Sequence, residues 1–214
     1  MKHKAVIFDL DGTILDTLDD LKNSVNFALT ENGLPERSYE EVRSFVGNGI
    51  RLLIERAVPE NTDSGVIDRC FEDFKSHYKE HSADNTKPYE GIIALLEELK
   101  SKGVKLAVVS NKADFAVQTL VEEYFQGLFD FAVGEREGIR RKPCPDSVNV
   151  AMNVLGVTSD EVFYVGDSEV DVETSHNAGV RCVAVTWGFR DKCVLESLSP
   201  EYIIDKPSQL MELI

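Results

Sequence analysis

The sequence predicts an α/β fold in which a parallel β-sheet is interrupted, after its first strand, by a helical insert. Three observations support this prediction. Short apolar, β-branched runs recur from residue 105 onward, with helical patterns between them. The runs are almost continuously apolar, as expected for strands that helices cover on both faces. Residues 17–81 contain no convincing strand, although an apolar run precedes them.

Six segments have the composition of strands, and helical spacing of apolar residues fills the intervals between the later ones. The expected strands are residues 4–10, 105–111, 129–134, 161–167, 181–187 and 202–205. The expected helices between them are residues 91–103, 114–125 and 145–156. This alternation predicts βαβ units, and therefore parallel strands.

The insert has helical patterns over residues 17–33, 39–49 and 67–81. Its second junction is polar and contains Pro88, as is typical of a linker. We therefore expect an α/β domain formed by residues 1–15 and 85–214, and a helical domain formed by residues 16–84.

Composition limits the partners. The 214 residues are 43% hydrophobic, with a formal net charge of -15 and a pI of about 4.7. Nucleic acid and anionic membranes would repel such a chain, so we expect neither as a partner. The N-terminal apolar run is too short for a signal peptide, and no stretch is long enough to span a bilayer. The cysteines lack C-x-x-C spacing, which favours reduced thiols and a cytoplasmic location. They are Cys70, Cys144, Cys182 and Cys193.

Two aspartates, Asp9 and Asp11, follow the first apolar run in the stretch F-D-L-D-G-T. Residues i and i+2 of a strand point to the same face, so a continuing strand would crowd two negative charges together. Like charges at that distance raise each other's pKa unless a cation or a proton intervenes. The pattern indicates a metal, a shared proton or a break in the strand, and Gly12 favours a break there.

Polar residues also follow other strands. The strand at 105–111 ends in Ser110-Asn111-Lys112, and the strand at 161–167 ends in Asp167, with Asp171 just beyond. A basic cluster, R-R-K-P-C-P, occupies residues 140–145. Ligands of open parallel sheets bind beyond the carboxyl ends of the strands. Several carboxylates at that edge suit Mg²⁺, which takes oxygen ligands and often shares them with phosphate.

The stretches F-D-L-D-G-T, V-V-S-N, R-R-K-P and G-D-S-E-V-D, in this order, resemble the four motifs of the haloacid dehalogenase-like (HAD) phosphatases. The match covers residues 4–16 and 88–205. It implies a Rossmann-like parallel-sheet core with an inserted α-helical cap domain. D-T-L-D-D-L-K-N-S-V-N-F-A-L, F-V-G-N-G and S-N-K are most similar to the phosphoglycolate phosphatase branch.

The resemblance implies roles for the first motif. Asp9 would be the nucleophile that forms an aspartyl-phosphate, and Asp11 the general acid/base. Asp9 and the main-chain carbonyl of Asp11 would also be Mg²⁺ ligands. The alternative is a polar turn, since Asp and Gly are common in turns.

The second and third motifs imply phosphate binding. The Ser110 hydroxyl, Asn111 and Lys142 would bind the substrate, with Ser110 and Lys142 taking part in catalysis by stabilising the transferring phosphoryl group. The alternative for Ser110 and Asn111 is an N-cap of the helix at 114–125. The alternative for Lys142 is a solvated lysine ahead of a helix that begins at a proline.

The fourth motif implies metal binding. Asp167 would be a metal ligand, and Asp171 would support the metal through water or orient Lys142. The alternative for Asp171 is a capping box with Ser168, which leaves Asp167 unexplained.

The insert contains the loop F-V-G-N-G-I-R over residues 45–51. Gly47 and Asn48 would approach the substrate, and Arg51 would pair with a carboxylate such as that of phosphoglycolate. The alternative is a turn between helices with Arg51 on a solvated face. His77 and His81 are expected on a solvated helix face.

The leading hypothesis is a Mg²⁺-dependent phosphatase of small phosphate monoesters, most of all 2-phosphoglycolate. Pyrophosphatase and sugar-phosphate phosphatase or phosphomutase activities on the same scaffold are alternatives, and a non-catalytic binding protein is the alternative from another class. The expected partner is a small phosphate ester, and the expected oligomer is a monomer or homodimer. Trp187 is expected in the core.

Overall fold

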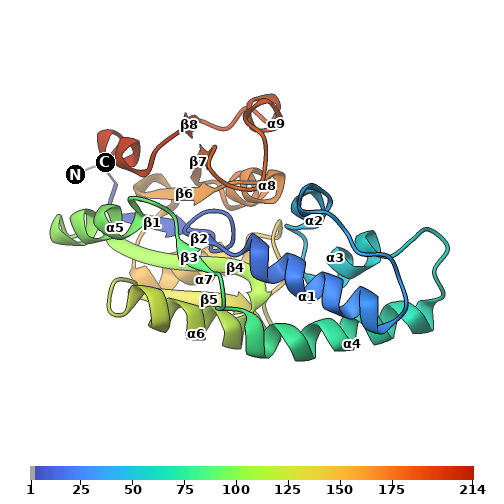
Figure 1. The fold of residues 1–214 in the computed structure, drawn as a ribbon. Coiled ribbons are helices and arrows are strands. Elements are labelled where there is room, and N and C mark those ends of the chain that lie inside the picture. The colour runs from blue at the N-terminus through green and yellow to red at the C-terminus, as the bar shows by residue number, and fades with distance from the viewer. Residues whose placement is uncertain (1–2) are drawn as a thin grey trace. The chain divides into compact units, whose positions relative to one another are not determined.

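The computed structural model describes residues 3–214 (Figure 1). The chain divides into two compact units. The chain up to Leu15 together with Pro88–Ile214 forms the α/β unit, and Asp16–Lys87 forms the helical unit. The two segments that connect the units pair with each other as β2 (Leu15–Asp16) and β3 (Lys87–Pro88).

The α/β unit is built on a six-stranded sheet, and every paired neighbour that the structure describes is parallel. In spatial order the strands are β5 (Phe131–Glu135), β4 (Lys105–Ala113), β1 (Ala5–Phe8), β6 (Val162–Gly166), β7 (Arg181–Val185) and β8 (Tyr202–Ile204). All six expected strands are present, and the predicted α/β class is confirmed. Strands β1 and β6 are buried at every residue, which explains their uninterrupted apolar sequences.

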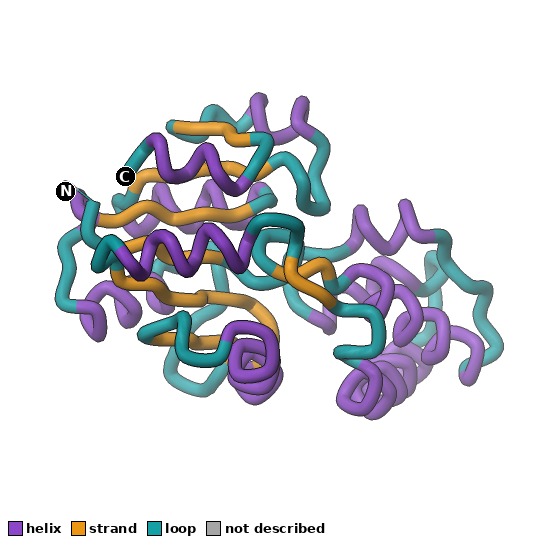
Figure 2. The backbone as a smooth tube through the Cα atoms, turned by 60° about the vertical axis from the view of Figure 1, so that its left-hand side comes forward, coloured by secondary structure: helices purple, strands orange, loops and turns teal. Residues whose placement is uncertain are grey.

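Helices cover both faces of the sheet, as Figure 2 shows for the strands in orange. The connecting helices are α5 (Ile92–Ser101), α6 (Asp114–Phe125), α7 (Asp146–Leu155), α8 (Glu169–Ala178) and α9 (Lys192–Ser197), with 3-10 turns at Ser159–Glu161 and Pro207–Glu212. The chain leaves β1 toward β4 and β5, but leaves β6 toward β7. Right-handed crossovers in opposite directions place α5 and α6 on one face and α7 and α8 on the other.

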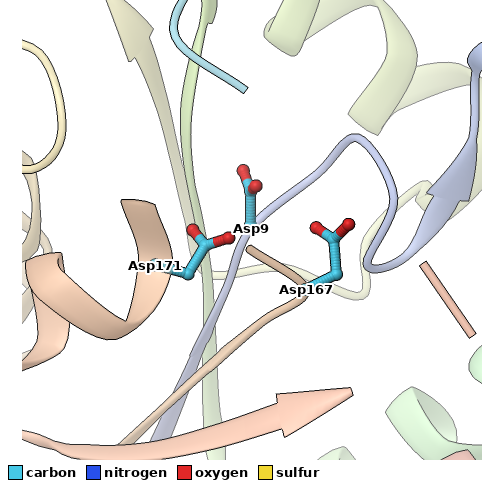
Figure 3. A group of neighbouring side chains, drawn as sticks. All are labelled: Asp9, Asp167 and Asp171. Atoms are coloured by element: carbon cyan, nitrogen blue, oxygen red, sulfur yellow. The ribbon is translucent and has the colours of Figure 1, made fainter. Parts of the chain in front are cut away.

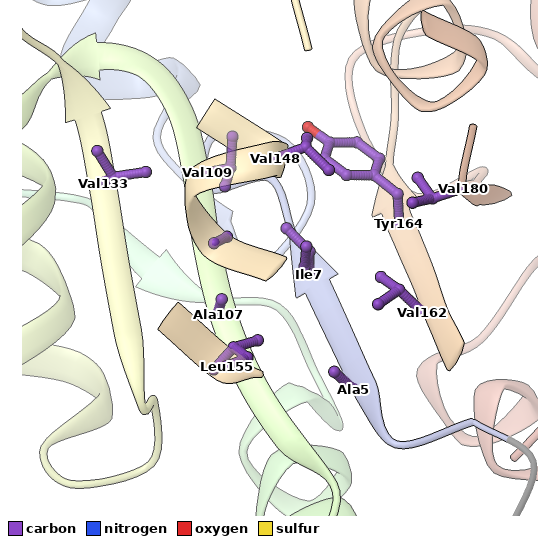
Figure 4. Close-up of a cluster of buried hydrophobic side chains, with 11 residues drawn as sticks. Ala5, Ile7, Ala107, Val109, Val133, Val148, Leu155, Val162, Tyr164 and Val180 are labelled. Carbon is purple, nitrogen blue, oxygen red and sulfur yellow. The ribbon is translucent and has the colours of Figure 1, made fainter. Parts of the chain in front are cut away.

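One buried cluster shows how a face is covered. Ile7, Ala107 and Tyr164, from three adjacent strands, pack against Val148 and Leu155 of α7 (Figure 4). Residues at period two in each strand contribute to this layer, because alternate side chains of a strand point to one face. None of the helices within residues 3–214 is both long and apolar enough to cross a membrane.

The helical unit contains α1 (Leu18–Glu31), α2 (Tyr39–Phe45), α3 (Ile50–Ala57) and α4 (Ser64–His81). It ends three residues beyond the junction expected from the sequence. The carboxylate of Asp20, which is 1% exposed, accepts hydrogen bonds from the backbone N–H groups of Asn85 and Thr86 at 2.9–3.0 Å. These bonds tie residues 85–86 to α1, a contact that no local pattern in the polar stretch indicates.

The helix expected over residues 39–49 is present but ends four residues earlier than predicted. Helix α2 ends at Phe45, and α3 begins after Gly49, whose φ is 85°. Gly47 has a φ of 125°, a conformation that L side chains rarely adopt. The two glycines therefore form a turn between helices, as the alternative interpretation of this stretch proposed.

Candidate active site

The motif residues come together at the carboxyl edge of the sheet because β4, β1 and β6 are adjacent. Asp9 follows β1, and its backbone N–H donates to the Val165 carbonyl at 2.9 Å, extending the β1–β6 ladder by one residue. Asp167 follows β6. Residues 110–112 lie within β4, the strand on the other side of β1. Segments far apart in sequence thus meet because their strands run parallel.

The crowding of Asp9 and Asp11 is resolved by a strand break and by two lysines. Strand β1 ends at Phe8, so the two aspartates do not share a strand face. Asp9 Oδ1 lies 2.9 Å from Lys142 Nζ, and Asp11 Oδ1 accepts a hydrogen bond from Lys112 Nζ at 2.9 Å. Asp9 and Asp11 therefore contact different lysines. Among the described residues, no donor is hydrogen-bonded to Oδ2 of either aspartate.

Lys142 is the centre of a buried network, so the interpretation as a solvated lysine is wrong. Its side chain is 3% exposed, and its ammonium group donates to Asp171 Oδ1 at 2.8 Å and to the Tyr164 hydroxyl at 3.1 Å. The Tyr164 hydroxyl donates to Asp171 Oδ1 at 3.0 Å. Burial alone would lower the pKa of Lys142, but Asp171 and Asp9 outweigh it and hold that pKa well above its usual value.

Asn111 holds the backbone of Lys142. Its side-chain amide donates to the Lys142 carbonyl at 3.1 Å, and its side-chain oxygen accepts from the Lys142 N–H at 2.8 Å. The N-cap interpretation of Ser110 and Asn111 is wrong, because α6 begins at Asp114 with Ala113 as its N-cap. Asn111 therefore positions the third motif rather than the helix that follows it.

The segment 110–112 is displaced from the regular ladder by a β-bulge. Val109 pairs with Val133 and Ala113 pairs with Glu135, so four steps along β4 match two along β5. A bulge re-aims side chains next to a site. Gly134 fits opposite because a Cβ there would collide with the Lys112 carbonyl and the Asp114 backbone. Within the bulge, the Ser110 hydroxyl oxygen accepts from the Lys112 N–H at 3.1 Å.

Asp167 is 1% exposed and accepts two hydrogen bonds. Its Oδ2 accepts from the Phe189 N–H at 2.7 Å, and its Oδ1 accepts from the Thr13 hydroxyl at 3.2 Å. Burial and the nearby Asp171 charge raise the pKa of Asp167 to about 7, despite these two bonds. Gly12 has a φ of 80°, and a Cβ at this position would overlap the Asp167 carboxylate. The glycine of F-D-L-D-G-T thus permits this close approach.

Asp171 both contacts Lys142 and forms the capping box with Ser168, the two roles that the sequence suggested as alternatives. Its Oδ2 accepts from the Ser168 backbone N–H at 3.1 Å and from the Ser168 hydroxyl at 2.6 Å, which makes the capping box. Its Oδ1 accepts from Lys142 and Tyr164. Burial raises the pKa of Asp171, but Lys142 and the hydroxyl groups of Ser168 and Tyr164 outweigh it and lower the pKa.

The three buried aspartates form a group that suits a divalent cation. Carboxylate oxygens of Asp9, Asp167 and Asp171 lie within 4.8 Å of one another, around one space at the end of β1 and β6 (Figure 3). Burial raises the pKa of Asp9 well above its usual value although Lys142 opposes the shift. The protein groups alone therefore do not balance the negative charge. Hard carboxylate oxygens with excess negative charge fit a divalent cation.

Sequence reasoning assigned no role to several residues of this site. The sequence predicts no role for Lys112, which follows Ser110 and Asn111, or for Tyr164, which lies in the expected strand 161–167. Trp187 was assigned to the core, but its indole N–H donates to the Thr13 carbonyl at 3.0 Å. It also lines a cleft of about 590 Å³ with Tyr89 and Met211. Only the position of these residues after or within strands β4, β6 and β7 could have indicated a role.

The predicted substrate-reading residues Gly47, Asn48 and Arg51 belong to the helical unit. Arg51 donates to Glu55 at 2.8 Å and to Asp68 at 2.6 Å, and Asn48 accepts from Arg56 at 3.0 Å. A substrate carboxylate would have to replace one of the two acidic partners of Arg51.

The expectation of a solvated face for the histidine pair is only partly correct. His81 is exposed and contacts Asp84, but His77 stacks on Phe27 with ring centroids 4.2 Å apart. His77 Nδ1 lies 2.9 Å from the Ser24 hydroxyl. His77 therefore packs α4 against α1, and His81 stacks on His77 with ring centroids 4.3 Å apart.

Similarity to known proteins agrees with this geometry. The family model for haloacid dehalogenase-like hydrolases matches residues 6–185. The phosphoglycolate phosphatase of Aquifex aeolicus is 34% identical over 212 residues, which cover 99% of this chain and 96% of the relative. The phosphoglycolate phosphatase of Chromobacterium violaceum is 32% identical, and the match covers 100% of this chain and 98% of that relative.

A solved structure of a candidate phosphoglycolate phosphatase from Lactobacillus delbrueckii is 41% identical, with a TM-score of 0.95 over 100% of this chain and 99% of the other. The fold, the order of the four motifs and these similarities lead to one conclusion. The chain belongs to the haloacid dehalogenase-like hydrolases and is similar to their phosphoglycolate phosphatases along its whole length.

Proposed function

We propose that this protein is a Mg²⁺-dependent phosphatase that hydrolyses 2-phosphoglycolate through a phosphorylated Asp9. One observation carries the proposal. Asp9 is buried with one oxygen held by Leu10 N–H at 2.7 Å and by Lys142, while its other oxygen accepts no hydrogen bond from the described residues. A carboxylate with one fixed and one unengaged oxygen is arranged for nucleophilic attack.

The reaction has two steps. In the first, Asp9 Oδ2 forms a bond to phosphorus while the bond from phosphorus to the ester oxygen breaks, and Asp11 gives a proton to the departing oxygen. In the second, water attacks phosphorus, its proton passes to Asp11, and the bond between phosphorus and Asp9 breaks. Phosphate leaves and both aspartates are regenerated.

Lys142 and Ser110 would bind the phosphoryl oxygens. The Lys142 ammonium group already lies beside Asp9 and is kept protonated by Asp171, so its charge is available where phosphoryl charge develops. The Ser110 oxygen accepts from the Lys112 N–H, which leaves the hydroxyl proton for a phosphoryl oxygen. Asn111 contributes by holding the Lys142 backbone.

Asp9, Asp167 and the main-chain carbonyl of Asp11 would hold the Mg²⁺ ion, with Asp171 acting through Lys142 or water. Each Asp171 oxygen accepts two hydrogen bonds from protein donors, whereas each Asp167 oxygen accepts one, which favours the indirect role for Asp171. When bound, the ion supplies positive charge that offsets the buried aspartates and the phosphate.

The choice of 2-phosphoglycolate comes from the relatives, which carry that name at 32–34% identity over nearly their full length. The helical unit would act as a cap, with Gly47, Asn48 and Arg51 nearest the substrate. Pyrophosphatase and sugar-phosphate phosphatase or phosphomutase activities on the same scaffold are the alternatives.

Phosphate release from a substrate panel tests the proposal. The panel holds 2-phosphoglycolate, pyrophosphate, hexose phosphates and nucleoside monophosphates, each with and without Mg²⁺. We expect Mg²⁺-dependent release, fastest from 2-phosphoglycolate. Preference for another member would reject the substrate and keep the chemistry, and no release from a folded protein would favour the non-catalytic binding protein.

Asp9→Asn tests the nucleophile. This variant keeps the size of the side chain and should lose turnover with every substrate, because an amide oxygen is a poor nucleophile toward phosphorus. Asp160→Asn, at an exposed position in the 3-10 turn before β6, is the matched control and should behave as wild type. Turnover of Asp9→Asn at the rate of the control would remove Asp9 from the mechanism.

A further inference from the structure

We infer that Lys112 is a positioning residue that fixes which oxygen of Asp11 exchanges protons with the substrate. The inference rests on the proposed role of Asp11 as general acid/base. It adds a second lysine to the site, with a task different from that of Lys142.

The contact between Lys112 and Asp11 is close, sheltered and long-range. Nζ of Lys112 donates to Asp11 Oδ1 at 2.9 Å, and the side chains are 4% and 17% exposed. The residues are 101 positions apart in sequence. Exposed ion pairs contribute little to stability, but a lysine this deeply buried is held in one orientation by its surroundings.

The backbone of β4 is shaped to deliver Lys112 to this position. Lys112 lies inside the bulge between Val109 and Ala113, and its N–H donates to the Ser110 hydroxyl oxygen at 3.1 Å. Gly134 leaves room for the Lys112 carbonyl, where any Cβ would collide. The bulge therefore directs Ser110 and Lys112 to the same edge.

The consequence for Asp11 concerns its two oxygens. An ammonium group has three donors and no acceptor, so the oxygen beside it must act as an acceptor. Oδ1 can accept from Lys112 both as part of a carboxylate and as the carbonyl oxygen of the protonated acid. When Asp11 is protonated, its proton is therefore confined to Oδ2, because Lys112 donates to Oδ1. No hydrogen-bond donor among the described residues contacts Oδ2. The same oxygen would protonate the departing alkoxide and later take the proton from water.

Pre-steady-state kinetics with two kinds of leaving group test the inference. Lys112→Met removes the ammonium group and keeps the length of the chain. Phosphorylation of the enzyme by 2-phosphoglycolate or glycerol phosphate needs a proton on an alkoxide, so we expect its rate to fall by about 10- to 100-fold. Phosphorylation by p-nitrophenyl phosphate needs no such proton, and its burst of p-nitrophenolate should keep the wild-type rate, followed by slow turnover. KM should change little for any of the three.

Controls separate the possible outcomes. Lys112→Arg should recover part of the alkyl-phosphate rate, and Lys112→Met should add no further loss to Asp11→Asn. Equal losses with alkyl and aryl phosphates would overturn the inference, since Lys112 would then act on the phosphoryl group. A loss with 2-phosphoglycolate but not with glycerol phosphate would also overturn it, because Lys112 would then read the substrate carboxylate. If wild-type protein hydrolyses none of the three, the proposed function itself fails.

Discussion

Replacing Asp167 by Asn should stabilise the metal-free protein, although it removes a proposed metal ligand. The shape is preserved, because an amide oxygen can accept from Phe189 N–H as Asp167 Oδ2 does at 2.7 Å. The amide NH₂ can donate to the Thr13 hydroxyl oxygen, which lies 3.2 Å from Oδ1. The substitution therefore removes a buried negative charge with little change in packing.

The magnitude follows from the raised pKa of Asp167. Burial and Asp171 raise it from 3.8 to about 7 in the folded protein. Between these values the folded state keeps a proton that the unfolded state has lost, so the free energy of unfolding falls as pH rises through this window. The full effect is about 4 kcal/mol, at about 1.4 kcal/mol per pKa unit. Asp167→Asn has no carboxylate at this position and avoids this loss of stability. We therefore expect its free energy of unfolding to exceed that of wild type by roughly 2–4 kcal/mol at about pH 8.

Thermal unfolding in a chelator measures this gain. For a chain of this size, 1 kcal/mol corresponds to about 2–4 °C, so Tm should rise by roughly 4–16 °C near pH 8 and by less than half of that near pH 5. Added Mg²⁺ should raise Tm of wild type and leave the variant unchanged.

Asp171→Asn is the opposite control for this measurement. Burial raises the pKa of Asp171, but Lys142 outweighs it and lowers the pKa, so the ionised carboxylate stabilises the fold above its unfolded pKa. Its loss should lower Tm near pH 8. A lower Tm for Asp167→Asn, or a gain equal at both pH values, would refute the argument.

Three further predictions concern other contacts. Asn111→Ala removes both hydrogen bonds to the Lys142 backbone. In steady-state assays it should lower kcat equally with 2-phosphoglycolate and p-nitrophenyl phosphate. A loss of kcat with only one of these substrates would contradict this role. Asp20→Ala leaves the backbone N–H groups of Asn85 and Thr86 without the carboxylate that accepts from them, and it should destabilise the helical unit by about 2–4 kcal/mol. Urea unfolding measures this loss, and an unchanged midpoint would refute it. Arg51→Ala should raise KM for 2-phosphoglycolate more than for p-nitrophenyl phosphate, and equal changes would exclude a carboxylate-reading role.

The order of the strands and helices was predictable because each of them has a local pattern of apolar residues. A continuous apolar run such as A-V-I-F and the helical spacing of residues 145–156 depend only on neighbours in sequence. The four motifs were recognisable for the same reason, since each occupies a few consecutive residues. The two aspartates also favoured a break in the first strand, predicted at Gly12, although β1 ends earlier, at Phe8.

Which partner each polar group takes was decided by tertiary structure. Asp9 and Asp11 are two residues apart, yet one contacts Lys142 and the other Lys112. The bulge in β4 and the parallel register of β1 with β6 bring these groups together. The sequence by itself determined the fold class and the residues that carry chemistry, because those signals are local. Only the folded chain decided the pairing of charges, because electrostatic contacts depend on distances between segments a hundred residues apart.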